Sequence, residues 1–110
     1  MTTIEVNDSE GRFSIKISGH SGYSKAGCDI VCSAVSVLAF TLLQESKERQ
    51  KSITDFNYEI KDGYFHVHFG YQPDNSIKTV IHTVLCGLKM VAEEYPDNVR
   101  INSCPKGGEI

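Results

Sequence analysis

The sequence lacks an excess of basic residues, and it contains no low-complexity segment. Lysine and arginine together number 11 against 14 aspartates and glutamates, which gives a formal net charge of -3. A protein that neutralises nucleic-acid phosphates needs a basic surface, so we expect no direct nucleic-acid partner. The remaining composition, 40% hydrophobic and 23% charged, is typical of a folded globular chain.

A long hydrophobic run is also missing. The longest apolar stretch, residues 35–43, is far shorter than the ~20 residues that span a bilayer. The N-terminal sequence MTTIEVNDSE has no charged region followed by an apolar one, so it does not have the form of a secretory signal. We therefore expect a cytoplasmic protein that does not enter a membrane.

No Cys-x-x-Cys motif is present among the four cysteines, which are Cys28, Cys32, Cys86 and Cys104. A reducing cytosol favours free thiols, metal ligands or a catalytic nucleophile over disulfides. Because the zinc-finger spacing is missing, the close pair His66 and His68 is expected to be solvated on one face of a strand. We expect no bound metal and no cofactor.

The length of 110 residues fits a single domain, residues 1–110, with one core. Alternating apolar residues predict five strands, and apolar residues at helical spacing predict two helices. The strands are expected at residues 2–6, 13–18, 54–60, 64–69 and 99–102, and the helices at residues 30–50 and 77–94. The predicted fold class is α+β, with the order β-β-α-β-β-α-β and a mainly antiparallel sheet covered by two helices.

Three local patterns refine this prediction. Asp62-Gly63 between two alternating runs predicts a type I′ hairpin, since both residues tolerate a positive φ. The first half of the first helix is apolar nearly all round, which predicts a place at the centre of the fold or in a subunit contact. For Cys86, inside the second helix, and Cys104, in the tail, we expect structural roles.

The chemistry is concentrated in GHSGYSKAGCDIVCSAVS, residues 19–36, which joins the second strand to the first helix. Asp29 stands directly before the helical run and is expected to cap it. Cys32 then falls at the third helical position, where unpaired N–H groups and the positive end of the helix dipole favour a thiolate. His20 ends the preceding strand, and the loop between them would bring it to the thiol as a base.

The rest of the stretch supports this arrangement without deciding it. The glycines Gly19, Gly22 and Gly27 allow tight turns, and the loop 21–27 is expected to be mobile because it has little to bury. Ser36 is a plausible neighbour of the thiol. A cysteine on an apolar helix is usually a small core residue, so the residues alone leave the catalytic and the structural interpretation open. Cys28 lies outside the helix, where the dipole favours an anion less.

The same stretch resembles the signature of the ribosomal-processing cysteine proteases, bacterial enzymes in which a Gly-His pair precedes a glycine-rich loop and an Asp-Ile-Val-Cys helix start. The similarity extends to the chain length and the order of elements. It implies a dyad of Cys32 as nucleophile and His20 as base, with Asp29 at the acidic position beside the cysteine. The sequence departs from the family pattern at Ser21, Cys28 and Ser33, which leaves the dyad intact.

The resemblance also implies a task and a partner. The implied task is the removal of an N-terminal extension from a large-subunit ribosomal protein, with bulky apolar residues before the cut. The implied form of the enzyme is a homodimer. Tyr23 and aromatic residues of the sheet would supply apolar subsites, and N–H groups of the first helical turn are candidates for the oxyanion hole. Asp29 either orients His20 or only caps the helix, and we favour capping.

Two other functions stay open at this point. A non-enzymatic, ribosome-associated module would bind a peptide through the loop, and its thiol would have ordinary reactivity. A thiol redox protein would pair Cys28 with Cys32 if the loop distorts.

Overall fold

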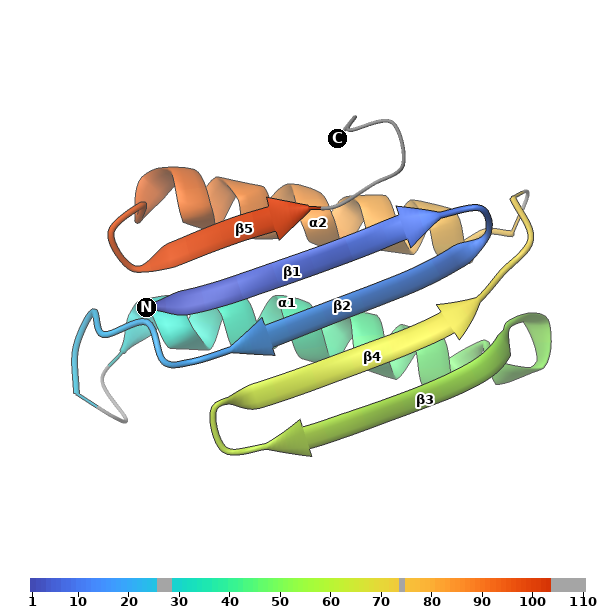
Figure 1. Cartoon of the computed structure of the whole chain (residues 1–110), viewed down its shortest axis with the longest axis horizontal. Coiled ribbons are helices and arrows are strands. Elements are labelled where there is room, and N and C mark those ends of the chain that lie inside the picture. Colours follow the sequence, from blue (N-terminus) through green and yellow to red (C-terminus); the bar gives the residue numbers. More distant parts are fainter. Residues whose placement is uncertain (26–28, 74, 104–110) are drawn as a thin grey trace.

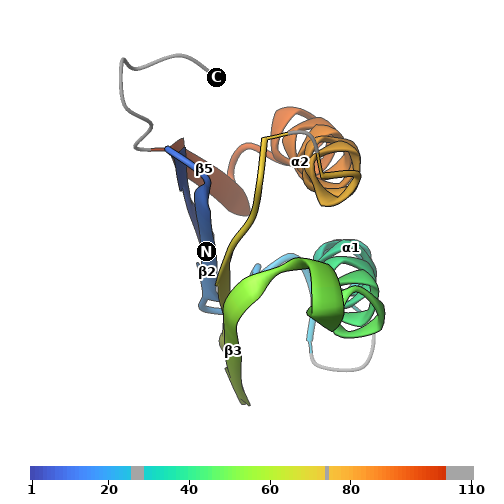
Figure 2. The ribbon, with the colours of Figure 1, turned by 90° about the vertical axis from the view of Figure 1, so that its right-hand side faces the viewer.

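The computed structural model describes residues 1–25, 29–73 and 75–103. Two helices cover one face of a five-stranded sheet and leave the other face open (Figures 1 and 2). The predicted class and order of elements are confirmed, with a short 3-10 helix, Gln50–Ser52, added after the first α-helix. The elements are β1 (Thr2–Ser9), β2 (Arg12–Ser18), α1 (Ile30–Glu48), β3 (Thr54–Lys61), β4 (Tyr64–Gly70), α2 (Ile77–Glu94) and β5 (Val99–Ser103).

The strand order in the sheet is β3-β4-β2-β1-β5. Three neighbouring pairs are antiparallel, as predicted, and β1 pairs with β5 in parallel. The central strand β2 therefore ends between the start of β1 and the start of β4, with Ser18 opposite Thr3 on one side and Tyr64 on the other. The loop that carries the chemistry leaves the sheet at this point.

The core lies between the sheet and the helices. In β2 and β4 every second side chain is buried, which confirms the alternation in the sequence. The helices contribute one face each, and Gly87 allows α2 to approach α1 so closely that a Cβ there would lie 2.8 Å from the side chain of Leu38. The buried helical residues are Val31, Val35, Ala39, Leu42, Leu43 and Ser46 in α1 and Ile77, Ile81, Val84 and Leu88 in α2.

Helix α1 buries only part of its apolar surface. Ile30, Val37 and Phe40 are 57%, 66% and 47% exposed, so the described residues do not enclose the helix. Its length and hydropathy would allow a membrane span, alone among the helices of the described residues. Its buried face nevertheless packs on the sheet like that of a core helix. A subunit contact over its exposed face stays a prediction.

The hairpin between β3 and β4 has the predicted two-residue loop, but its predicted turn type is wrong. Gly63 has a φ of 70°, whereas Asp62 is not among the residues with positive φ. The turn also bonds to the end of β2, because the Gly63 carbonyl accepts a hydrogen bond from the Gly19 N–H at 2.9 Å. The pattern of two positive φ values occurs instead at Glu10 and Gly11, between β1 and β2.

Structural roles were predicted for two cysteines, Cys86 and Cys104. Cys86 is a free thiol exposed on α2 and lies outside the core, so its structural role stays a prediction. The helical periodicity of the sequence places its neighbours Val84 and Leu88 in the core, and Cys86 falls between them on the outer side. Cys104 lies outside the described residues.

Candidate active site

The backbone directly before His20 is held in place at the end of β2. Gly19 has a φ of 86°, and a Cβ on this residue would overlap the carbonyl oxygen of Met1. The N–H of Gly19 donates to Gly63, and its carbonyl accepts a hydrogen bond from the Thr2 hydroxyl at 3.3 Å. The chain is therefore clamped between β1 and the hairpin tip directly before His20, which leaves the sheet at this point with 67% of its side chain exposed.

Asp29 caps α1, as predicted. Its Oδ1 accepts hydrogen bonds from the N–H groups of Val31 and Cys32 at 3.0 and 2.9 Å, and its main-chain carbonyl accepts the N–H of Ser33 at 3.1 Å. The N–H groups of Val31, Cys32 and Ser33, which were candidates for an oxyanion hole, are thus already bonded in the free protein. An oxyanion hole at the first turn stays a prediction, and the cap residue competes with it for these donors.

The second oxygen of Asp29 holds the preceding loop. Oδ2 accepts a short hydrogen bond from the Ser21 hydroxyl and longer ones from the N–H groups of Tyr23 and Ser24, at 3.2 and 3.3 Å. The residues between 21 and 24 therefore turn around one buried carboxylate. Among the described residues the oxygens of Asp29 have no bond to His20, which favours the capping role over an orienting one.

These contacts set the ionisation of Asp29. Burial by itself would raise the pKa of this carboxyl. Hydrogen bonds from the Ser21 hydroxyl and from the N–H groups of Cys32 and Ser24 outweigh burial and hold the pKa of Asp29 well below its usual range. The carboxylate is therefore charged throughout the neutral range and stabilises the joint between the loop and α1.

We expect Asp29→Asn to lower the melting temperature by several degrees at pH 7. Asparagine keeps one capping oxygen but replaces the other, which accepts the loop hydrogen bonds, with an NH2 donor, so the variant removes the charge and these bonds together. Because the folded-state pKa is depressed, the stabilisation by Asp29 is complete above the unfolded-state value of about 4 and is lost as the pH falls below it. Melting curves from pH 7 to pH 3 should show the difference from wild type shrinking below pH ~4; a constant difference would contradict this account.

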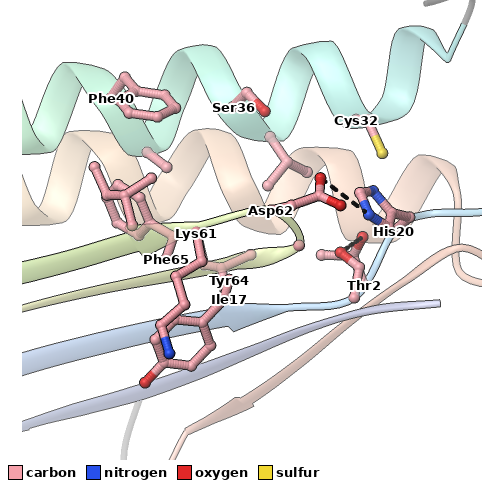
Figure 3. A pocket seen from close by; sticks show the side chains of 15 residues that line it. Thr2, Ile17, His20, Cys32, Ser36, Phe40, Lys61, Asp62, Tyr64 and Phe65 are labelled. Carbon is pink, nitrogen blue, oxygen red and sulfur yellow. Dashed lines mark hydrogen bonds and ion pairs between the residues drawn. The ribbon is translucent and has the colours of Figure 1, made fainter. Parts of the chain in front are cut away.

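Cys32 lies at the third position of α1, and its free thiol is partly exposed. Its Sγ accepts a hydrogen bond from the backbone N–H of Ser21 at 3.3 Å. The sulfur therefore sits between the start of the helix and the loop that follows His20. Figure 3 shows Cys32 and His20 at the same end of the pocket, with the sulfur and the imidazole both facing its space.

A carboxylate that the motif does not contain also lies near His20. Asp62 Oδ1 is 3.7 Å from His20 Nε2, at the tip of the β3–β4 hairpin (Figure 3). Gly63 leaves room for the ring, because a Cβ there would lie 3.2 Å from the same nitrogen. Sequence reasoning used Asp62-Gly63 only as a turn signal. Only the pairing of β2 with β4 reveals that this turn reaches the histidine.

A groove of about 240 Å³ runs from these groups along α1. Its polar end contains His20, Cys32 and Asp62. Its far end is apolar and includes Phe40 and Phe65, whose rings meet edge to face with centroids 5.5 Å apart. The other apolar lining residues are Ile17, Val35, Ala39 and Ile60.

The remaining predicted residues occupy different places. Ser36 and Gly19 line the groove beside the thiol and the imidazole. Gly22 lies in the loop with a φ of 73°, and Gly27 lies outside the described residues, as does the alternative thiol Cys28. Tyr23 does not line the groove, since its ring packs against Tyr95 with centroids 5.3 Å apart.

The first half of the loop is bonded to the rest of the fold. Ser21 is 2% exposed, and its carbonyl accepts a hydrogen bond from the side chain of Asn98 at 3.0 Å. The contact of Tyr23 with Tyr95 adds an aromatic pair. The mobility expected of the loop stays a prediction, and these contacts restrict it most at residues 21–24.

The histidines of the open face form a separate group. His66 Nε2 lies 3.1 Å from the hydroxyl of Ser14, and the rings of His66 and His68 are 5.2 Å apart. Burial, followed by the nearby charges of His68 and Lys16, lowers the pKa of His66, so this ring is neutral at neutral pH. Within residues 1–25, 29–73 and 75–103, no three His, Cys, Asp or Glu side chains are grouped for a metal ion.

A thiol and an imidazole at the polar end of an apolar groove are the arrangement of a cysteine protease. The family model for the cysteine protease Prp matches residues 1–100, and the chain belongs to this family. The chain is thus an enzyme rather than a binding module without activity.

Relatives in Staphylococcus aureus match most of the chain. The ribosomal processing cysteine protease Prp of that organism is 28% identical over 99 residues, which are 90% of this chain and 93% of that protein. The crystal structure of the essential S. aureus protease with a covalently linked product peptide has a TM-score of 0.81 and 26% identity, and covers 94% of this chain and 100% of the other. A second structure, with a substrate peptide, has a TM-score of 0.76 and 24% identity over the same shares and supports the fold.

Proposed function

We propose that this cysteine protease removes the N-terminal extension of a large-subunit ribosomal protein during ribosome assembly. The observation that carries the proposal is the apolar groove that leads directly to Cys32 and His20. A groove of this kind suits an extended peptide with bulky apolar side chains, and the S. aureus relative is called a ribosomal processing protease. The single domain of residues 1–110 would carry the whole activity.

The proposed chemistry uses Cys32 and His20 as a dyad. The thiolate of Cys32 attacks the scissile carbonyl carbon, a C–S bond forms, and the carbonyl oxygen takes the negative charge. When the C–N bond breaks, the imidazolium of His20 gives its proton to the leaving amine and a thioester remains. Water then attacks the thioester while His20 accepts a proton, the C–S bond breaks, and the carboxylic acid product leaves as the thiolate of Cys32 and the imidazolium of His20 are restored.

In this scheme the two nitrogens of His20 have different roles because of the position of Asp62. A protonated imidazole has two N–H donors. Nε2 lies toward Asp62, which leaves Nδ1 for exchange of the proton with the thiol and the leaving amine. Both side chains of the Asp62 contact are mostly exposed, so in the free enzyme this ion pair is weak.

The length of the groove sets the number of substrate residues. From Cys32 to Phe40 the helix rises by about 12 Å, because each helical residue adds about 1.5 Å. An extended peptide covers that length with roughly three to four residues. We propose that these residues precede the cut and that their apolar side chains occupy the end of the groove formed by Phe40, Ile60 and Phe65.

Phe40→Ala is expected to raise KM for a peptide substrate roughly tenfold and to leave kcat within about twofold, because it removes an apolar contact far from the reacting bond. Phe40 is 47% exposed, so the fold should tolerate the change. Val37→Ala is the matched control, since Val37 is exposed on the same helix but does not line the groove. Equal KM values for the two variants would remove the groove from the binding site.

The proposed function is tested with a peptide copied from the extended N-terminus of the host's own ribosomal protein. Mass spectrometry should detect one cut in this peptide and negligible turnover of a scrambled peptide of the same composition or of casein. Selectivity is expected because a small protease with few subsites has to recognise a short sequence. Equal rates for the two peptides would refute specific processing.

The proposal includes a cytoplasmic homodimer. The exposed apolar residues of α1, Ile30 and Val37, support a subunit contact on that helix. Light scattering at micromolar concentration should give twice the mass of the chain, and a monomer would contradict this part of the proposal.

A further inference from the structure

The thiol of Cys32 needs a source of stabilisation other than the first turn of α1. Asp29 already accepts the N–H groups of Val31 and Cys32, and its negative charge lies at the positive end of the helix. The helix dipole therefore stabilises a thiolate at Cys32 less than it would without the charge of Asp29. A donor from another part of the chain has to supply what the helix does not.

The backbone N–H of Ser21 is such a donor. It is the one group among the described residues that donates a hydrogen bond to Cys32 Sγ, at 3.3 Å. We propose that this N–H stabilises the thiolate in the free enzyme and then the oxyanion of the tetrahedral intermediate. The second step is geometrically reasonable because the oxyanion is only two bonds away from the sulfur, so a donor that faces Sγ also reaches the oxygen.

The surroundings of Ser21 fix the direction of this N–H. The residue is 2% exposed, its hydroxyl is bonded to Asp29, and its carbonyl is bonded to Asn98. Glycines with positive φ stand at positions 19 and 22, on both sides of the segment. A donor that is held before the reaction stabilises developing charge without having to reorganise, which is what an oxyanion hole requires.

In this proposal Ser21 acts through its main chain, and Asp29 and Asn98 are positioning residues. Asn98 follows α2 and lies far from the motif in sequence, yet its side-chain amide donates to the Ser21 carbonyl at 3.0 Å. It would hold the peptide plane that follows Ser21. The inference rests on the proposed dyad, because it assumes that Cys32 is the reacting thiol.

The test replaces the amide of Ser21 with an ester, which removes one N–H and keeps the side chain. Cys28 allows a full-length protein to be made by joining a synthetic segment 1–27 to residues 28–110. The control ester is at Ser24, whose N–H donates to Asp29 at 3.3 Å instead of to the sulfur. We expect the Ser21 ester to lower kcat about 100-fold with KM little changed, and the Ser24 ester to stay within about threefold of wild type.

A second readout is independent of the peptide substrate. The Ser21 ester should slow alkylation of Cys32 by iodoacetamide at fixed pH, whereas the Ser24 ester should stay within about fivefold of wild type. Should the ribosomal peptide prove not to be a substrate, the proposed function fails while the alkylation rates still test the role of Ser21. Equal kcat and equal alkylation rates for the two esters would overturn the inference.

A third readout needs no ester and covers the case of an ester that does not fold. In uniformly folded protein, Cys32→Ala should move the amide proton resonance of Ser21 upfield, because its acceptor is lost, and leave that of Ser24 in place. An unmoved Ser21 resonance would show that the N–H does not bind the sulfur, and the inference would be withdrawn.

Discussion

Replacing Cys32 or His20 with alanine is expected to lower the rate of peptide cleavage by about a thousandfold or more. The first change removes the nucleophile, and the second removes the group that transfers the proton to the leaving amine. Both side chains line the groove rather than the core, so the melting temperature should change little. Initial rates with the ribosomal peptide, measured beside thermal unfolding, check both expectations.

The control for this experiment is Cys86→Ala. Cys86 is the other free cysteine of the described residues, and it is exposed on α2. Its loss should leave the rate unchanged. A Cys32 or His20 variant that cleaves at the wild-type rate would remove that residue from the dyad, and a defect in Cys86→Ala would mean that the reacting thiol lies elsewhere.

Gly19→Ala is expected to have the second largest effect. A residue other than glycine pays about 1 to 3 kcal/mol for a φ of this kind, and here the added Cβ also meets the backbone carbonyl of Met1. The strand end has to shift, and His20 shifts with it. A misplacement of about 1 Å at a reacting group costs about 100-fold in rate, so kcat should fall by at least this factor and the melting temperature should fall as well.

Gly22→Ala is the matched control for the clash. Gly22 has a similar φ of 73°, but the nearest atom to a Cβ there is the Met1 nitrogen at 3.9 Å. This variant suffers the backbone strain without the overlap. Its kcat should fall much less than that of Gly19→Ala, and equal defects in the two variants would mean that strain alone, rather than the clamp at the end of β2, explains the result.

The elements of the fold were predictable because their signals are local. The structure confirms the alternation in β2 and β4 and the helical spacing in α2, because each pattern already encodes which face of the element is buried. The position of β3 at the edge of the sheet was not predictable in the same way. Tyr58 and Ile60 alternate like core residues but are 43% and 41% exposed, because an edge strand that extends past α1 leaves its apolar face to the solvent (Figure 2).

The residues of the site likewise divide into those whose relation is visible in the sequence and those that only the fold brings together. Cys32, His20 and Asp29 lie within one short segment, so their relation was visible in the sequence. Asp62 and Asn98 are brought to the site by the pairing of β2 with β4 and by the course of the chain between α2 and β5, which no spacing in the sequence reveals.

The bonded state of the first helical turn was missed for another reason. A capping residue predicts where a helix starts, but the same capping bonds engage the N–H groups of Val31 and Cys32, two of the donors that the oxyanion prediction counted as free. The two predictions used the same donors for different purposes. In the structure these two N–H groups bind Asp29, whereas the N–H of Ser21 donates to the sulfur of Cys32.

The most direct test of the account is the rate at which iodoacetamide alkylates each cysteine, followed by mass spectrometry at several pH values. The account predicts that Cys32 reacts fastest of the four and still reacts at pH ~6.5, below the range in which an ordinary thiol with a pKa near 8.5 forms its thiolate. His20→Ala should remove this advantage. Cys86 is the internal reference, because it is the more exposed of the two thiols in the described residues. If Cys86 reacts as fast as Cys32 at that pH, Cys32 is not an activated nucleophile and the account is wrong.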